Sequence, residues 1–169
     1  MEQIISPPQL WPASSIVYYV GTGIESWGPD SIEQGIGGSE EAVIYLSREL
    51  ARAGWKVTVF CQREDHYEDE VDGSHYPITY KPYCEINARD TFNVFIASRH
   101  PEYVHNIKAR LKLVDLHDAI PESNLLTVID EVDKFMVKSK WHRDLYQNIP
   151  DDKFVIIGNG IVKEQFDEA

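Results

Sequence analysis

The chain has 169 residues, of which 43% are hydrophobic, enough to build the core of one domain. Its 28 acidic and 16 basic side chains give a formal net charge of −12, so we expect no nucleic-acid partner. No apolar run approaches the roughly 18 residues of a transmembrane helix, so no membrane span is expected.

The cysteines and the chain start bear on the cellular compartment. Cys61 and Cys84 form neither a disulfide framework nor a metal-ligand spacing, and Cys61 ends an apolar segment, as a buried thiol would. The start, Met-Glu-Gln-Ile-Ile-Ser-Pro-Pro, lacks the basic and apolar parts of a secretion signal. We therefore expect a cytoplasmic protein. His100 and His105 are separated by Pro101 and do not match a metal-binding pair, so no metal is expected.

Strand and helix signals alternate along the chain. A Pro-containing leader (1–14) precedes the first strand, and residues 62–77 are expected to be polar and irregular. Strands are predicted at 15–20, 56–61, 78–81, 91–97, 109–116, 134–137 and 153–157, and helices at 39–53 and near 101–106, 121–129 and 140–147. This order predicts an α/β fold: a Rossmann-like parallel sheet of six or seven strands with helices on both faces.

The helix after the first strand has the clearest pattern. Val43, Leu46 and Leu50 recur at spacings of three and four, together with Ala53, which predicts one apolar face. Ser39 is expected to be the N-cap, and Gly54 follows the end of the helix.

A glycine-rich loop leads into this helix. Gly37 and Gly38 leave the backbone N–H groups at the helix start uncovered, so a phosphate could approach closely. This loop is the leading candidate for a ligand site.

Polar residues follow the other predicted strands, at the sheet edge where such folds bind ligands. They are Gln62, Ser98-Arg99-His100, His117-Asp118, Ser139-Lys140 and Gly158-Asn159-Gly160.

Several familiar sites fit poorly. The loop from Gly35 has Glu40 in place of the third glycine of a dinucleotide fingerprint, and it lies far from the preceding strand. The chain has no Gly-Lys-Ser/Thr of a P-loop and no G-x-S-x-G of a nucleophilic hydrolase.

Five segments together resemble a known family. They are Gly-Ile-Gly-Gly-Ser-Glu-Glu opening a helix, Lys-Val-Thr-Val-Phe-Cys, His117-Asp118, Val-Lys-Ser-Lys-Trp-His-Arg-Asp-Leu-Tyr and Ile-Gly-Asn-Gly-Ile. In this order they resemble the N-terminal domain of retaining group 1 glycosyltransferases with the two-domain B-type fold, related to sucrose and glycogen synthases. The resemblance spans residues 15–166.

The resemblance implies an acceptor-side domain that faces a donor-binding domain across a cleft. It implies that Gly37 and Gly38 contact the diphosphate of a nucleotide-diphosphate sugar and that His117 is the catalytic residue beside the transferred sugar. Possible acceptor or cleft contacts are Asp118, Arg99, Ser139, Lys140 and Asn159.

The C-terminal donor-binding domain, which carries the family's phosphate-gripping bases and paired glutamates, is not expected within this chain. We expect the chain alone to be inactive and to need that domain, a nucleotide-sugar donor and a sugar or glycan acceptor, but no cofactor. The alternatives are a non-catalytic Rossmann-like interaction or regulatory domain and a dinucleotide-dependent oxidoreductase.

Overall fold

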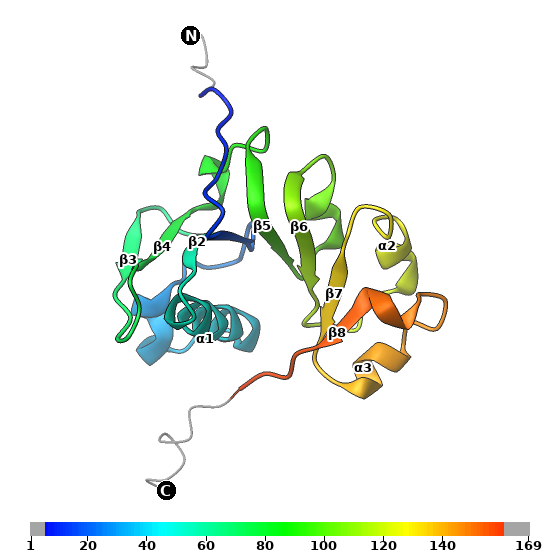
Figure 1. Ribbon diagram of the computed structural model, residues 1–169. Coiled ribbons are helices and arrows are strands. Elements are labelled where there is room, and N and C mark those ends of the chain that lie inside the picture. Colours follow the sequence, from blue (N-terminus) through cyan, green and yellow to red (C-terminus); the bar gives the residue numbers. More distant parts are fainter. Residues whose placement is uncertain (1–5, 161–169) are drawn as a thin grey trace, which may run out of the picture.

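The computed structural model describes residues 6–160, which form one eight-stranded sheet with strand order β3-β4-β2-β1-β5-β6-β7-β8 (Figure 1). The strands are β1 (Ser15–Tyr19), β2 (Lys56–Cys61), β3 (Tyr67–Asp69), β4 (Ile78–Pro82), β5 (Thr91–Ser98), β6 (Lys108–Asp115), β7 (Lys134–Val137) and β8 (Phe154–Ile156). Every neighbouring pair is parallel except β3–β4. The α/β class and the largely parallel sheet are therefore confirmed.

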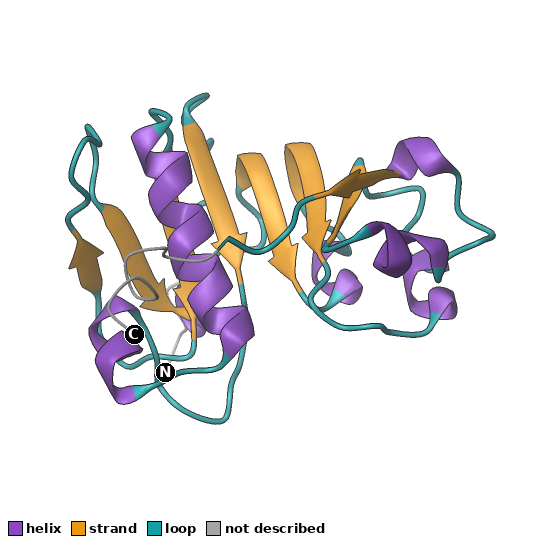
Figure 2. Ribbon diagram, turned by 90° about the horizontal axis from the view of Figure 1, so that it is seen from below, coloured by secondary structure: helices purple, strands orange, loops and turns teal. Residues whose placement is uncertain are grey.

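The helices are α1 (Gly38–Arg52), α2 (Glu122–Leu126) and α3 (Lys140–Asp144), with 3-10 turns η1 (Pro29–Gln34), η2 (Tyr83–Glu85), η3 (Pro101–Val104) and η4 (Asp151–Lys153). Figure 2 shows the long helix α1 lying along one half of the sheet, with short helices beyond the other half. The helices expected near 101–106, 121–129 and 140–147 are shorter than predicted. After α2 and α3 the chain turns, while Val128 and Tyr146 remain packed in the core.

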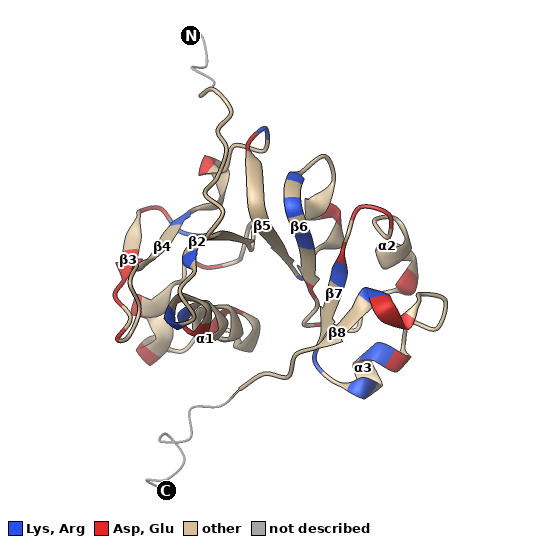
Figure 3. Ribbon diagram, viewed as in Figure 1, with Lys and Arg blue, Asp and Glu red and all other residues tan. Residues whose placement is uncertain are grey.

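The expectation of six or seven strands was wrong, because the acidic segment contributes β3. Asp69 is 6% exposed and accepts two hydrogen bonds from the guanidinium of Arg48 on α1, at 2.8 and 3.0 Å. Tyr67 pairs antiparallel with Tyr80 of β4. Since the charge of Asp69 is neutralised by a residue 21 positions away, the local composition did not predict a strand. Figure 3 shows the acidic residues gathered on β3 and its flanking loops.

The end of the expected leader is joined to the sheet. The backbone N–H of Gln9 and the indole N–H of Trp11 donate to Asp90, at 2.8 and 2.9 Å, and Leu10 forms a parallel bridge with Thr91. Trp11 also packs on Phe92, with ring centroids 5.6 Å apart. Residues 9–11 therefore lie beside the start of the central strand β5 before β1 begins.

Helix α1 begins earlier than expected. Its N-cap is Gly37, and Ser39 makes no side-chain cap, because its hydroxyl donates to Glu40 instead. The most buried positions are Val43, Ile44, Ser47 and Ala51, whereas Leu46 and Leu50 are half-buried and Ala53 is exposed. The apolar face is thus rotated toward Ile44, where α1 packs against β2 and β4. The stop is as expected: Gly54 follows with φ +98°.

Two apolar clusters stabilise the sheet. One contains Val17 and Phe95 together with Leu125 of α2. The other contains Tyr18 of β1 and Ile44 of α1, and also Cys61, the expected buried thiol. These clusters hold the strand ends in fixed positions, so the residues that follow them are presented on a rigid edge.

Candidate functional site

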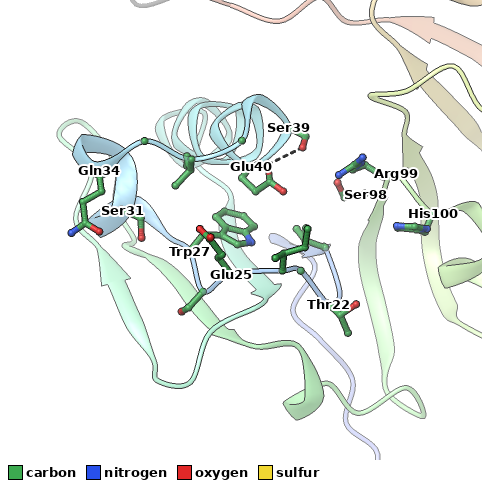
Figure 4. A pocket seen from close by; sticks show the side chains of 17 residues that line it. Thr22, Glu25, Trp27, Ser31, Gln34, Ser39, Glu40, Ser98, Arg99 and His100 are labelled. Carbon is green, nitrogen blue, oxygen red and sulfur yellow. Dashed lines mark hydrogen bonds between the residues drawn. The ribbon is translucent and has the colours of Figure 1, made fainter.

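The sheet has a switch point between β1 and β5. From β1 the chain continues to β2 on one side of the sheet, whereas β5 and the strands after it in the sequence lie on the other side. In open α/β sheets, ligands bind at the carboxyl ends of the strands beside such a switch point. A cavity of about 660 Å³ opens at this place (Figure 4). Its walls are the loop after β1, η1, the start of α1, and the end of β5 with the residues that follow it: Val20, Thr22 to Trp27, Ser31, Gln34 to Gly37, Ser39, Glu40 and Ser98 to His100.

The loop after β1 is fixed by one buried cation. The side chain of Arg63, which is 3% exposed, donates to the carbonyls of Trp27 and Asp65 and pairs with the carboxylates of Asp30 and Asp65. Gly28 lies so close that an added Cβ would collide with the Arg63 guanidinium. This contact fixes the cavity wall that carries Trp27.

The start of α1 forms the opposite wall. Gly37 is extended, at φ −63° and ψ 147°, and has no side chain to cap the helix. The carboxylate of Glu40 lies against it, since an added Cβ at Gly37 would collide with Glu40 Oε2. Ser39 Oγ donates to the same oxygen over 2.8 Å.

The end of β5 and the residues that follow it provide the third wall. Ser98 is 1% exposed, and its hydroxyl has no hydrogen-bond partner among the described residues. Arg99 has a left-handed backbone, φ +65°, which costs a non-glycine residue about 1–3 kcal/mol and is typical of functional sites. Its Nε donates to Asp118 over 2.7 Å, which links the cavity rim to the end of β6.

A buried charged network lies beside this rim. The carboxylate of Asp115, 1% exposed, accepts hydrogen bonds from Tyr18, from His117 Nε2 at 3.0 Å and from Lys138 Nζ at 2.6 Å. Burial alone would raise the pKa of Asp115, but the bonds and charges of His117 and Lys138 outweigh it and lower that pKa. Burial, followed by the nearby carboxylate, raises the pKa of Tyr18 well above its ordinary value.

His142 is a structural partner of this network. Its Nδ1 accepts from the backbone N–H of Lys138, at 3.3 Å, so Nε2 carries the proton and donates to the carbonyl of Asp118 at 3.1 Å. Burial lowers the pKa of His142. A neutral imidazole therefore links the loop after β6 to the loop after β7.

The structure places some of the predicted site residues at the cavity and the others away from it. Gly37 and Arg99 line the cavity, Gly38 follows Gly37, and Asp118 touches Arg99. The side chain of His117 is only 6% exposed and bonds Asp115 instead of lining this cavity.

The remaining predicted contacts lie elsewhere. Ser139 caps α3 by accepting from the N–H of His142, at 3.1 Å. Lys140 is exposed and pairs with Asp144 on the same helix, and Asn159 is exposed near the end of the described residues. These three side chains do not line the cavity.

Tyr18, Asp115 and Lys138 were not predicted as part of a site. The position of Asp115 near the end of a strand predicted within the sheet was a signal, because a carboxylate that is buried there needs partners. Nothing in the sequence indicated that Tyr18 would be one of them.

Within residues 6–160, no group of three or more His, Cys, Asp or Glu side chains is placed to hold a metal ion. None of the helices in that range is long and apolar enough to cross a membrane.

Comparisons with protein-family models, with curated proteins and with solved structures found no match to this chain.

Proposed function

We propose that the chain is the acceptor-side half of a glycosyltransferase that moves a sugar from a nucleotide-diphosphate sugar to an acceptor with retention. The observation that carries this proposal is the cavity at the switch point, bounded by the glycine-rich start of α1 and by the polar ends of the central strands. Hydroxyl, amide and carboxyl groups from Thr22, Ser31, Gln34 and Glu40 surround it, as a polyhydroxylated ligand requires.

The proposal includes a Rossmann-like arrangement with helices on both faces. It is supported by the alternation along β1, where Tyr18 joins the cluster that contains α1 and Val17 joins the cluster that contains α2. Successive strand residues point to opposite faces of a sheet, so α1 and α2 cover opposite sides.

In this proposal Gly37 and Gly38 contact the donor diphosphate through their backbone N–H groups. His117 acts at the cleft edge, held by Asp115. Most of the donor contacts would come from a second, donor-binding domain.

Backbone amide shifts of the chain during titration with UDP, ADP and GDP test the proposal. A few N–H donors contribute around 1 kcal/mol each, so we expect millimolar affinity at best, with shifts centred on Gly37, Gly38 and Ser39. NAD is the control ligand. Micromolar binding of a nucleotide, or preferential binding of NAD, would contradict the proposal.

A test of the proposed catalytic role of His117 requires a protein in which this chain is joined to a donor-binding domain. There, His117→Ala should lower turnover by about a hundredfold with little change in donor affinity, because the lost contact stabilises the transition state. Gly38→Val should instead weaken donor binding, since an added Cβ meets no protein atom within 4 Å but would obstruct a phosphate. Unchanged turnover of His117→Ala would remove His117 from the catalytic role.

A second candidate is a non-catalytic interaction domain. It is favoured by the exposure of Trp141 on α3, which is 68% exposed, and of Leu145 at the C-cap of this helix, which is 40% exposed. Failure of every nucleotide titration, together with protection of Trp141 by a protein partner, would favour this candidate.

A further inference from the structure

A carboxylate lies beside the start of α1, although no backbone N–H among the described residues donates to it. Gly37 caps the helix without a side chain, and the carboxylate of Glu40 turns back against it, held by the hydroxyl of Ser39 at 2.8 Å. Figure 4 shows Ser39 and Glu40 together at the cavity wall, joined by this hydrogen bond. A helix start favours negative charge through its free N–H groups and its dipole, so the position of Glu40 is a favourable one for any anion.

The wall across from Glu40 carries an unsatisfied group. Ser98 lines the same cavity, is 1% exposed, and its hydroxyl has no partner among the described residues. Figure 4 places Ser98 across the cavity from Ser39 and Glu40. Leaving a buried hydroxyl without a hydrogen bond is unfavourable, and such groups in native proteins call for a specific explanation. Because this oxygen is covered, a ligand in the cavity would become its partner after the Ser98 side chain turns toward the cavity.

We propose that Glu40 limits the affinity of this cavity for phosphate groups because it competes with a phosphate for the start of α1. Two anions cannot share one helix start without strong repulsion, so a diphosphate enters only after the Glu40 carboxylate turns away. The Ser98 hydroxyl then donates to the bound anion from the opposite wall. The inference takes its ligand class, a diphosphate, from the proposed function.

Inorganic pyrophosphate is the probe that tests this competition, because it lacks the sugar and the base. The full chain and its Glu40→Gln variant are titrated at constant ionic strength, with affinity from calorimetry and position from amide shifts. If Glu40 occupies the helix start in roughly nine molecules of ten, its neutralisation should tighten pyrophosphate binding about tenfold. The shifts should centre on Gly37, Ser39 and Ser98.

Glu41→Gln is the matched control. Glu41 lies in the same first turn, and its substitution removes the same charge from the same helix, but its side chain does not line the cavity. The affinity of the Glu41→Gln variant for pyrophosphate should stay within about twofold of that of the unsubstituted chain. Equal gains in both variants would show a general charge effect and overturn the proposal, as would equal affinity of Glu40→Gln and the unsubstituted chain.

Ser98→Ala in the Glu40→Gln background tests the second contact. It should weaken pyrophosphate binding by about threefold to tenfold, the loss of one hydrogen bond. Unchanged affinity would remove Ser98 from the site. If pyrophosphate behaves as expected but no nucleotide-diphosphate sugar binds, the proposed function fails while the role of Glu40 stands. Amide spectra of each variant without ligand establish that the fold is intact.

Discussion

The hydroxyl of Tyr18 in β1 donates to the carboxylate of Asp115 in β6, although β5 lies between these two strands. Both side chains are almost completely buried, at 0% and 1% exposed. Lys138, which follows β7, completes the same site. One carboxylate therefore connects the ends of three strands, β1, β6 and β7, at the edge of the sheet that carries the cavity.

Tyr18→Phe should lower the free energy of unfolding by about 1–3 kcal/mol, because Asp115 loses a buried donor while the ring still fills its place. Urea denaturation measures the change. Tyr76→Phe is the control, since Tyr76 is 44% exposed and its substitution should change stability by less than about 0.5 kcal/mol. Equal stability of both variants would show that the hydroxyl of Tyr18 contributes nothing to the site.

Acid should destabilise the fold in two steps. The pKa of His142 is lowered from 6.5, so below pH 6.5 the unfolded chain binds protons that the folded chain does not, and the free energy of unfolding falls. That fall ends once the pH is below the folded-state pKa. The pKa of Asp115 is lowered from 3.8, so a further loss begins near pH 4 and proceeds as the folded carboxylate is protonated.

Urea unfolding at a series of pH values measures these slopes. His142→Gln should remove the first step, whereas His75→Gln, at an exposed position, should leave it in place. A pH dependence between 7 and 5 that is identical in all three proteins would contradict the assignment to His142.

Ser98→Ala should leave the free energy of unfolding unchanged or raise it by up to about 1 kcal/mol, because it deletes a buried hydroxyl that has no partner. Ser15→Ala is the matched comparison at the opposite end of the sheet. Ser15 is 2% exposed and its hydroxyl donates to the carbonyl of Pro12, so its loss should cost about 1 kcal/mol. Thermal melting distinguishes them; a Ser98→Ala variant less stable than Ser15→Ala would show that Ser98 is bonded within the fold.

Gly28→Ala should destabilise the chain by about 1–3 kcal/mol, since the new methyl group would collide with the buried guanidinium of Arg63. The backbone at Gly28 is extended, so the conformation itself tolerates alanine. Gly38→Ala is the control because an added Cβ there meets nothing within 4 Å. Chemical denaturation compares the two, and a neutral Gly28→Ala would mean that Arg63 can move without cost.

The strand pattern was predictable because buried parallel strands are continuous apolar runs, as in Thr91–Ser98. The position of the cavity followed from the same reasoning, since residues after parallel strands meet at one edge. Strand β3 could not be predicted, because its buried Asp69 depends on Arg48 of α1. The partners of Asp115 could not be predicted either, because Tyr18 is 97 residues away in the sequence.

The directions of several side chains could not be predicted from the sequence either. The pattern at the start of α1 favoured Ser39 as the cap, but its hydroxyl bonds Glu40, and this choice depends on the space that the glycines leave. The predicted contacts Ser139 and Lys140 are explained by helix capping and a local ion pair. Polar residues after strands indicate an edge of the sheet, and only the packed structure shows which of them share a cavity.

The central position of β1 has a consequence for the order in which the chain folds during synthesis. Both neighbours of β1 come later in the sequence: β2 begins at Lys56 and β5 at Thr91. The first strand of this sheet to be synthesised therefore remains incompletely paired until much of the described chain has been made. Contacts this distant in sequence form slowly because loop closure must precede them. Until β5 has been synthesised, the exposed apolar residues of β1 favour aggregation of the nascent chain.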